Sequence, residues 1–354
     1  MGVRKKQIAI ACGVTGGRHP QMYGACVALA EAYSEYDIIA YFGFSGGSIA
    51  AALMSSEIHK KEGGPEAWIK KSTPYGKHGK VGGFPNIICN IWNLFIHGGL
   101  LNSKTLYKKV FKDMFNDLPL KKPVYAGAWC PSANVEVLFD LKKCCPGKAI
   151  ACSAALPFAI SPFEISNKEL ISLGYSDDIP GIADDPEGVS FFADGGISSA
   201  LGVGIVDNAD VIKKAELEAG IPIPVIGINV DPISYKHSTE FGEYPWYKKI
   251  WEACWGTIRS NVLDDIREAR SERYLQLCVI PTPKDLKKFS TKFDASYEEN
   301  LKLYKTGYSQ AKEWLSKSLE DGKSPVEAMD AWYEDALPKN SKVTLKKSRD
   351  NYRK

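Results

Sequence analysis

The stretch Ile38–Ser48 constrains the fold of this chain more than any other part of it. An apolar run typical of a β-strand leads into Gly43-Phe44-Ser45-Gly46-Gly47, and small apolar residues at helical spacing follow. A strand, a Gly-x-Ser-x-Gly turn and a helix in this order predict a nucleophile elbow, which presents the serine at the tip of a tight turn. Gly43 and Gly47 suit that turn because side chains there would clash with the strand and the helix. Ser45 is therefore the candidate nucleophile, and a structural turn in a glycine-rich loop is the alternative.

The composition is that of an ordinary globular protein. The chain has 354 residues, of which 44% are hydrophobic and 25% charged, and its net charge of +3 does not favour nucleic acid as a partner. No apolar run approaches the roughly 20 residues of a membrane helix, and the residues after Arg4-Lys5-Lys6 do not form a signal peptide. The nine cysteines, an odd number without Cys-x-x-Cys spacing, indicate reduced thiols in a cytoplasmic protein.

A second glycine-rich loop precedes the elbow by one predicted helix. The apolar strand Gln7–Cys12 leads into Gly13-Val14-Thr15-Gly16-Gly17-Arg18, and helical periodicity follows over Gly24–Tyr36. Such a loop suits a phosphate or an oxyanion, although neither the dinucleotide nor the P-loop pattern fits, and a plain connector is the other interpretation. Because parallel βαβ order brings such loops together, we expect this loop and the elbow at one edge of the sheet.

A carboxylate ends a later strand. Ser190–Ala193 is a short strand candidate that leads into Asp194-Gly195-Gly196. A carboxylate at the end of a strand lies where a parallel sheet presents catalytic groups, although an Asp-Gly pair alone more often marks a turn. The other expected elements are strands over Pro123–Trp129, Val135–Leu141, Pro224–Val230 and Leu275–Ile280, helices over Leu106–Leu118, Ala149–Phe163 and Tyr297–Leu319, a short helix from Gly322 through Trp332, and a surface loop over Lys168–Gly188.

Two aromatic-rich segments, Phe84–Ile96 and Tyr244–Trp255, suggest contact with a lipid surface. Core packing is the other interpretation of both. The tail from Pro338 holds seven Lys or Arg residues against one Asp, so we expect it to be disordered and attracted to anionic membranes.

Four blocks, in this order, resemble the patatin-like phospholipases, acyl hydrolases related to cytosolic phospholipase A2. The blocks are Gly13–Arg18, Gly43–Gly47, Ala151–Pro157 and Asp194–Gly196, and the resemblance extends from about residue 7 to residue 319. It implies a three-layer αβα fold with a mostly parallel central sheet over residues 1–322. Residues 323–354 would then form a C-terminal helix and the basic tail.

The resemblance also implies a site and a chemistry. Ser45 would be the nucleophile and Asp194 the base of a Ser–Asp dyad that needs neither metal nor cofactor. Backbone N–H groups of Gly13, Thr15, Gly16, Gly17 and Gly46 would form the oxyanion hole, and the remaining motif residues are Arg18, Gly43, Gly47, Gly195 and Gly196. The substrate would be a phospholipid or another acyl-ester lipid at a membrane surface. The presence of a protein activator and delivery into another cell stay open.

The first block departs from the usual family pattern of three glycines, one residue, and Arg-Gly. Aligned on Arg18, Val14 and Thr15 replace two of the glycines and His19 replaces the last one. The Asn-Pro that often follows Asp-Gly-Gly is also missing. Because backbone N–H groups are the oxyanion donors, a loop that keeps its shape can keep the hole.

Two other functions remain open at this point. The first is a Ser-His-Asp esterase, in which His237 would be the base because it alone of the five histidines follows Asp194. Against it, Ser45 comes after only two strand candidates, whereas the elbow of an ordinary α/β-hydrolase follows several more. The second is a non-catalytic lipid-binding scaffold with the same fold.

Overall fold

The computed structural model describes residues 6–75, 96, 99–199, 201, 205–230, 249, 256–258, 260–267, 273–286, 295–319 and 321–336. The strands are β1 (Gln7–Cys12), β2 (Asp37–Phe44), β3 (Gly99–Leu101), β4 (Val124–Cys130), β5 (Val135–Asp140), β6 (Phe158–Ile160), β7 (Phe163–Ser166), β8 (Val189–Asp194), β9 (Val225–Asn229) and β10 (Leu275–Val279). The helices are α1 (His19–Ala32), α2 (Gly46–Ser55), α3 (Gly64–Ser72), α5 (Ser103–Leu106), the π-helical η4 (Tyr107–Phe111), α6 (Lys112–Phe115), α7 (Pro146–Ser153), α8 (Asn167–Ser172), α9 (Asp210–Ala219), α11 (Tyr297–Ser316) and α12 (Pro325–Ala336).

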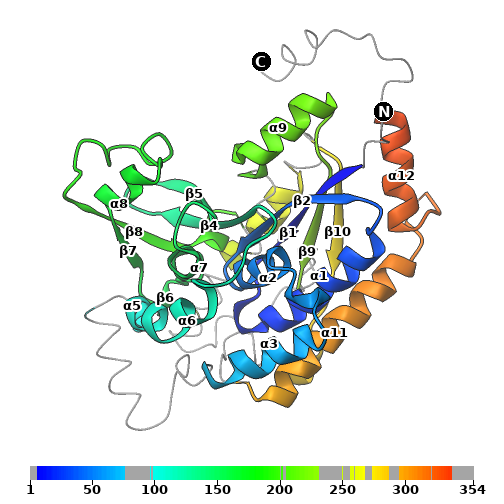
Figure 1. Ribbon diagram of the computed structural model, residues 1–354, viewed down its shortest axis with the longest axis horizontal. Coiled ribbons are helices and arrows are strands. Elements are labelled where there is room, and N and C mark those ends of the chain that lie inside the picture. The colour runs from blue at the N-terminus through cyan, green and yellow to red at the C-terminus, as the bar shows by residue number, and fades with distance from the viewer. Residues whose placement is uncertain are drawn as a thin grey trace.

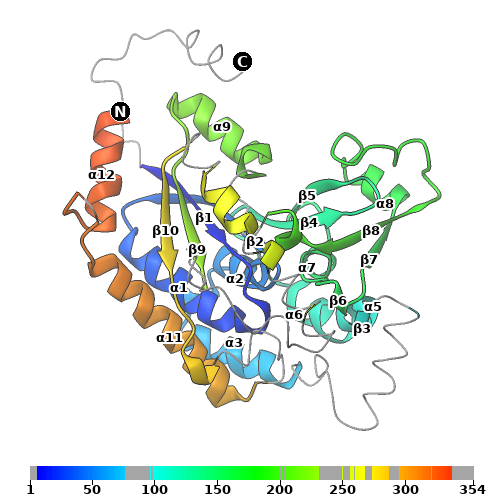
Figure 2. The ribbon, with the colours of Figure 1, turned by 180° about the vertical axis from the view of Figure 1, so that it is seen from behind.

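A central sheet organises the described residues into an α/β fold. Its strand order is β10-β9-β1-β2-β4-β8-β7, with β5 paired to β4, and β3 and β6 form a separate pair. Helices cover both faces, with α1, α2, α11 and α12 on one side and α9 on the other (Figures 1 and 2). The αβα layering expected from the sequence is therefore confirmed.

Five neighbouring strands, β10, β9, β1, β2 and β4, run parallel. Cys12 at the end of β1 pairs with Gly43 near the end of β2. The loops that follow these two strands therefore leave the sheet at the same edge, as the βαβ order predicted.

The sheet separates two hydrophobic clusters because successive side chains of a strand point to opposite faces. On β1, Ile8 and Ile10 face the cluster that holds α1, α2, α7 and α11, whereas Ala9 and Ala11 face the cluster that holds α9. Helices α1 and α11 approach so closely that a Cβ added at Gly24 would lie 2.1 Å from the Tyr304 carbonyl oxygen. This packing fixes α1, and with it the end of the first glycine-rich loop.

The strand that carries Asp194 runs in the opposite direction from the one we expected. β8 pairs antiparallel with both β4 and β7, so Asp194 does not follow a parallel strand. Register still brings it to the edge of the sheet where the two glycine-rich loops lie: Phe44 pairs with Gly127 on β4, and the next residue, Ala128, pairs with Asp194. Asp194 thus reaches the level of the β2 terminus from the other side of β4.

Two further expectations were wrong in detail. The helix expected over Ala149–Phe163 ends at Ser153, and Phe158 begins a strand, because Pro157 and Pro162 cannot continue a helix. The loop expected over Lys168–Gly188 begins inside α8. The Ser166 hydroxyl accepts a hydrogen bond from the Glu169 N–H (3.3 Å) and caps that helix.

Helix α12, which lies beyond residue 322, packs on the same core as the sheet. Met329 is buried in the cluster that holds α1, and the Tyr333 ring lies 5.9 Å from that of Tyr36. Among the described residues, no helix has the length and apolar character that a membrane span requires.

Several sequence predictions fall largely outside the described residues. They concern Tyr244–Trp255, the tail from Pro338 and His237. Of Phe84–Ile96 the structure describes Ile96 alone, and that side chain is exposed.

Candidate active site

Ser45 occupies a strained turn between β2 and α2. Its backbone has φ 54° and ψ −131°, a conformation that costs a non-glycine residue about 1–3 kcal/mol and that often marks functional sites. Both polar backbone groups of Ser45 are bound by serine hydroxyls. Its N–H donates to Ser153 Oγ (3.0 Å), and its carbonyl accepts from Ser48 Oγ (2.6 Å). The strand, strained turn and helix predicted from the sequence are therefore present around Ser45.

The glycines of the elbow have no room for a side chain. A Cβ added at Gly43 would lie 2.4 Å from Ser48 Cα, and one at Gly47 would lie 2.3 Å from the carbonyl oxygen of Cys12. Gly46, the first residue of α2, faces the first glycine-rich loop, since a Cβ there would lie 2.3 Å from the Gly16 carbonyl oxygen. The elbow and that loop are therefore in direct contact.

The carboxyl group of Asp194 is buried at this edge of the sheet, with 0% of the residue exposed. Its Oδ1 accepts a hydrogen bond from the Gly196 N–H (2.9 Å), while Oδ2 has no hydrogen-bond partner among the described residues. Burial raises the pKa of Asp194 to about 7, and the nearby Ser45 side chain and the Gly196 N–H act in the opposite direction. A carboxyl group with a pKa near neutrality can both take and return a proton there.

In the first glycine-rich loop, the backbone N–H of Gly13 already has an acceptor. It donates to the carbonyl oxygen of Ile228 on β9 (3.0 Å). Gly16 adopts φ 59°, the left-handed conformation that glycine tolerates without strain. Thr15, which replaces a family glycine, is fully buried, and its hydroxyl donates to the Gly16 carbonyl (3.1 Å).

Arg18 is 2% exposed, and its guanidinium group binds the backbone of this loop. Its Nε donates to the Thr15 carbonyl (3.1 Å), and its Nη1 donates to Thr282 Oγ1 after β10 (2.8 Å). The buried guanidinium therefore binds protein acceptors and orients the loop.

The turn after Asp194 joins the other two loops. A Cβ at Gly195 would lie 2.3 Å from the Gly127 carbonyl oxygen, and one at Gly196 would lie 2.3 Å from Val14 Cγ2. The segments around Ser45, Asp194 and Gly16, which are far apart in the sequence, therefore meet at one place.

The sequence did not predict the residues that support the segment after Asp194. Asn261, in the helical residues 260–267, donates to the Gly196 carbonyl (3.4 Å). Asp265 accepts from Ser199 Oγ (3.0 Å) and from the Leu201 N–H (2.6 Å). These contacts join segments that are far apart in the sequence, so no local sequence pattern predicts them.

The two described histidines take no part in this arrangement. His19 packs edge-on against Trp68 with ring centroids 6.0 Å apart, and burial lowers its pKa to about 4. His59 lies at the opposite end of β2. Among the described residues, no cluster of His, Cys, Asp and Glu side chains has an arrangement that could hold a metal ion.

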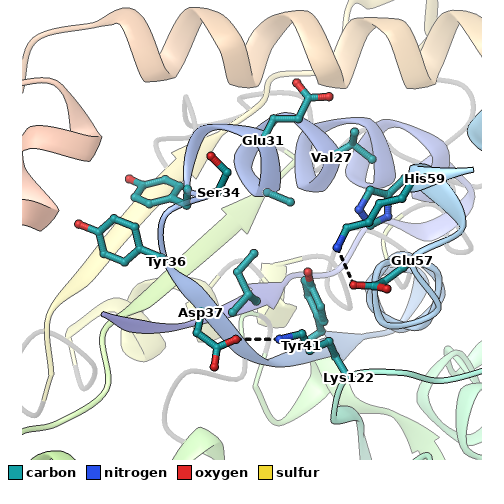
Figure 3. Close-up of a pocket in the computed structure, with 13 residues that line it drawn as sticks. Val27, Glu31, Ser34, Tyr36, Asp37, Tyr41, Glu57, His59 and Lys122 are labelled. Carbon is teal, nitrogen blue, oxygen red and sulfur yellow. Dashed lines mark hydrogen bonds and ion pairs between the residues drawn. The ribbon is translucent and has the colours of Figure 1, made fainter. Parts of the chain in front are cut away.

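A cavity of about 650 Å³ lies at the amino end of β2, away from Ser45 (Figure 3). Its lining includes Asp37, Glu57, His59 and Lys122. Figure 3 shows the ion pair between Asp37 and Lys122, whose Nζ and Oδ1 atoms are 2.7 Å apart. Lys60 Nζ lies 2.6 Å from Glu57 Oε1. The carboxylates that line this cavity are ion-paired, which sets it apart from the site at the carboxyl end.

Comparisons with known proteins give a distant likeness in structure. No protein-family model and no curated protein matches the sequence. VipD from Legionella pneumophila matches at 10% identity and a TM-score of 0.36, over 88% of this chain and 67% of that one. The type III effector protein ExoU matches at 13% identity and a TM-score of 0.31, over 87% of this chain and 52% of that one, so this chain spans about half its length. Both TM-scores are below 0.5, so neither likeness assigns a function to this chain.

Proposed function

We propose that this protein is a patatin-like lipid acyl hydrolase that cleaves carboxylic esters of phospholipids. One observation carries the proposal. A serine in the strained conformation of a nucleophile elbow lies beside a buried aspartate whose Oδ2 has no partner among the described residues. A buried carboxylate with one oxygen left without a partner is costly, and such costs are typical of catalytic sites.

In the first half-reaction Asp194 takes the proton of the Ser45 hydroxyl while Oγ attacks the acyl carbon. The carbonyl electrons move to the oxygen, and a tetrahedral oxyanion forms. When the ester C–O bond breaks, the proton passes from Asp194 to the departing alcohol, a lysophospholipid. The acyl group remains on Ser45.

In the second half-reaction water attacks the acyl-enzyme, and Asp194 accepts the proton of that water. Collapse of the second oxyanion releases the fatty acid and returns the proton to Ser45. Both reactions need the same two side chains, and neither needs a histidine.

Backbone N–H groups of Thr15, Gly16 and Gly17, together with that of Gly46, hold both oxyanions. The N–H groups in the first turn of α2 have no partner within their own helix, which suits them to bind negative charge. We leave Gly13 out because its N–H donates to Ile228. Arg18 keeps the loop in shape through the Thr15 carbonyl.

The substrate is presented at a membrane surface, where the enzyme acts as a peripheral protein from the cytoplasmic side. A hydrolysis assay on phosphatidylcholine vesicles and on a soluble acyl ester tests the activity and its site. Wild type is expected to release fatty acid from both, and Ser45→Ala from neither, while its circular dichroism and melting temperature stay those of wild type. Full hydrolysis by Ser45→Ala would end the assignment of this site.

The same soluble ester distinguishes the two alternatives. His237→Ala is expected to stay within a few-fold of the wild-type rate, whereas a large loss in a folded variant would favour the Ser-His-Asp esterase. A wild-type protein that binds vesicles but hydrolyses neither substrate would be the non-catalytic scaffold.

A further inference from the structure

The end of helix α7 binds the backbones of both proposed catalytic residues. The Ser45 N–H donates to Ser153 Oγ (3.0 Å), and the Asp194 N–H donates to the Ala155 carbonyl (2.9 Å). Ser153 is the last residue of α7, and Ala155 follows two residues later. One short segment thus holds the nucleophile from β2 and the base from β8.

Ser153 is the member of this segment that acts through its side chain. It is fully buried, and its hydroxyl oxygen accepts the N–H of the strained Ser45. Ser48, which binds the Ser45 carbonyl, belongs to the first turn of α2 and moves with the elbow. Ser153 belongs to another element, so its contact fixes the elbow relative to Asp194.

Helix α7 is itself anchored at its other end. The Gly147 N–H donates to Asn116 Oδ1 (3.2 Å), and a Cβ at Gly147 would lie 2.7 Å from the Phe111 carbonyl oxygen. Ile150 and Cys152 are fully buried in the hydrophobic cluster on this face of the sheet. The helix therefore has little freedom to shift, and Ser153 presents its hydroxyl from a rigid support.

We infer that Ser153 is a positioning residue, whose hydroxyl sets the place of Ser45 Oγ relative to the Asp194 carboxylate. The inference rests on the proposed function and deepens it. Ser153 touches no substrate. Loss of its oxygen leaves the buried Ser45 N–H without an acceptor, the strained backbone relaxes, and Oγ moves away from Oδ2. A displacement of about 1 Å in a reacting atom can cost about 100-fold in rate.

The test compares Ser153→Ala with Ser161→Ala. Ser161 is a matched control because it is also buried and its Oγ also accepts a backbone N–H, that of Ser103, at 3.0 Å, with no hydrogen bond to either catalytic residue. We measure kcat and KM on a soluble ester, the rate of labelling by a fluorophosphonate probe, and the melting temperature. Ser153→Ala is expected to lose roughly 10- to 100-fold in kcat and labelling rate with little change in KM.

Ser161→Ala is expected to lower the melting temperature but to keep the wild-type kcat and labelling rate. If a folded Ser153→Ala labels and turns over like wild type, the positioning role is wrong. Equal rate losses in both variants would also overturn it, because the effect would then be one of general stability. A wild type that neither labels nor hydrolyses contradicts the proposed function instead, so the two failures are distinct.

Ser153→Cys decides the question if Ser153→Ala does not fold. The thiol keeps the shape of the side chain and fills the space of the hydroxyl, but its sulfur is larger and is a weak acceptor. Its labelling rate is expected to fall about tenfold below that of wild type, and wild-type labelling by folded Ser153→Cys would reject the inference.

Discussion

The acidic side chains at the two ends of strand β2 have opposite environments, ion-paired at one end and buried at the other. At the amino end Asp37 is paired with Lys122, and Glu57 with Lys60 and Lys121, which lower the pKa of Glu57 to about 2. At the carboxyl end burial raises the pKa of Asp194 to about 7, and one of its oxygens has no partner among the described residues.

This contrast favours the carboxyl end of β2 over the amino end as the candidate catalytic site. The amino end has the cavity of about 650 Å³, but its carboxylates are satisfied by neighbouring lysines. The carboxyl end combines the strained Ser45 with a desolvated carboxylate, and both lower the stability of the folded state. Natural sequences accept such costs where function requires them, so these unfavourable local features favour the carboxyl end as the proposed site.

The largest expected effect comes from Asp194→Asn, which removes the base but keeps the shape of the side chain. We expect kcat on a soluble ester to fall by roughly 10³-fold or more, because an amide cannot accept the serine proton. A pH series on wild type should show activity rising with pH to a plateau, with a midpoint near 7, as Asp194 loses its proton. A flat profile between pH 5 and 9 would contradict the role of this carboxyl group.

The same substitution should stabilise the protein at alkaline pH. The pKa of Asp194 is higher in the folded protein than the ordinary value of 3.8, so the folded state holds this proton more tightly and wild-type stability falls as pH rises from about 4 to about 7. A rise to about 7 corresponds to at most roughly 4 kcal/mol. Chemical denaturation at pH 5 and 8 should therefore show Asp194→Asn gaining stability relative to wild type at pH 8. Equal pH dependence in the two proteins would mean that Asp194 is not desolvated.

A smaller but still large effect is expected from Gly47→Ala, with Gly227→Ala as its control. A Cβ at Gly47 would lie 2.3 Å from the Cys12 carbonyl oxygen, so the backbone of the elbow or of β1 must shift. We expect a loss of about 1–3 kcal/mol in the free energy of unfolding and roughly 100-fold in kcat. At Gly227 on β9 the nearest atom, Leu277 Cδ1, would be 3.4 Å away, an ordinary contact. That variant should keep its rate and melting temperature, and wild-type kcat in Gly47→Ala would show that the elbow tolerates displacement.

The smallest effect is expected at the amino end. Lys122→Met removes the partner of Asp37, whose side chain is 38% exposed. Because exposed ion pairs contribute little, the free energy of unfolding should fall by less than about 1 kcal/mol, and kcat should stay within about twofold. A tenfold loss in kcat with the fold intact would show that the cavity is coupled to the catalytic edge, which would remove the contrast between the two ends.

Local sequence patterns predicted the elements whose formation depends on interactions between nearby residues. The strand, turn and helix around Ser45 formed as expected, because apolar periodicity and glycine placement act over a few residues. The strands expected over Pro123–Trp129 and Val135–Leu141 also formed, as β4 and β5. Ser166-Asn167-Lys168-Glu169 has the pattern of a helix N-cap, and it marks the start of α8 where a loop was expected.

The rest depends on contacts that no local pattern encodes. The direction of β8 is set by its pairing with β4 and β7. The expected parallel strand before Asp194 was therefore wrong, even though Asp194 reaches the edge of the sheet where Ser45 lies. Ser153 lies in Ala151–Pro157, one of the four blocks that carry the family resemblance. Its hydrogen bond to Ser45 joins α7 to the elbow, however, and can be seen only in the folded structure. Burial, which shifts the pKa of Asp194, is likewise a property of the assembled core.

The most direct test of the central claim is to locate the covalent adduct of a fluorophosphonate probe by mass spectrometry of the full-length protein. The proposed pair of Ser45 and Asp194 predicts one modified residue, Ser45. It also predicts a labelling rate that rises with pH around 7 and falls at least 100-fold in Asp194→Asn. An adduct on another residue, or Asp194→Asn labelling as fast as wild type, would contradict the account.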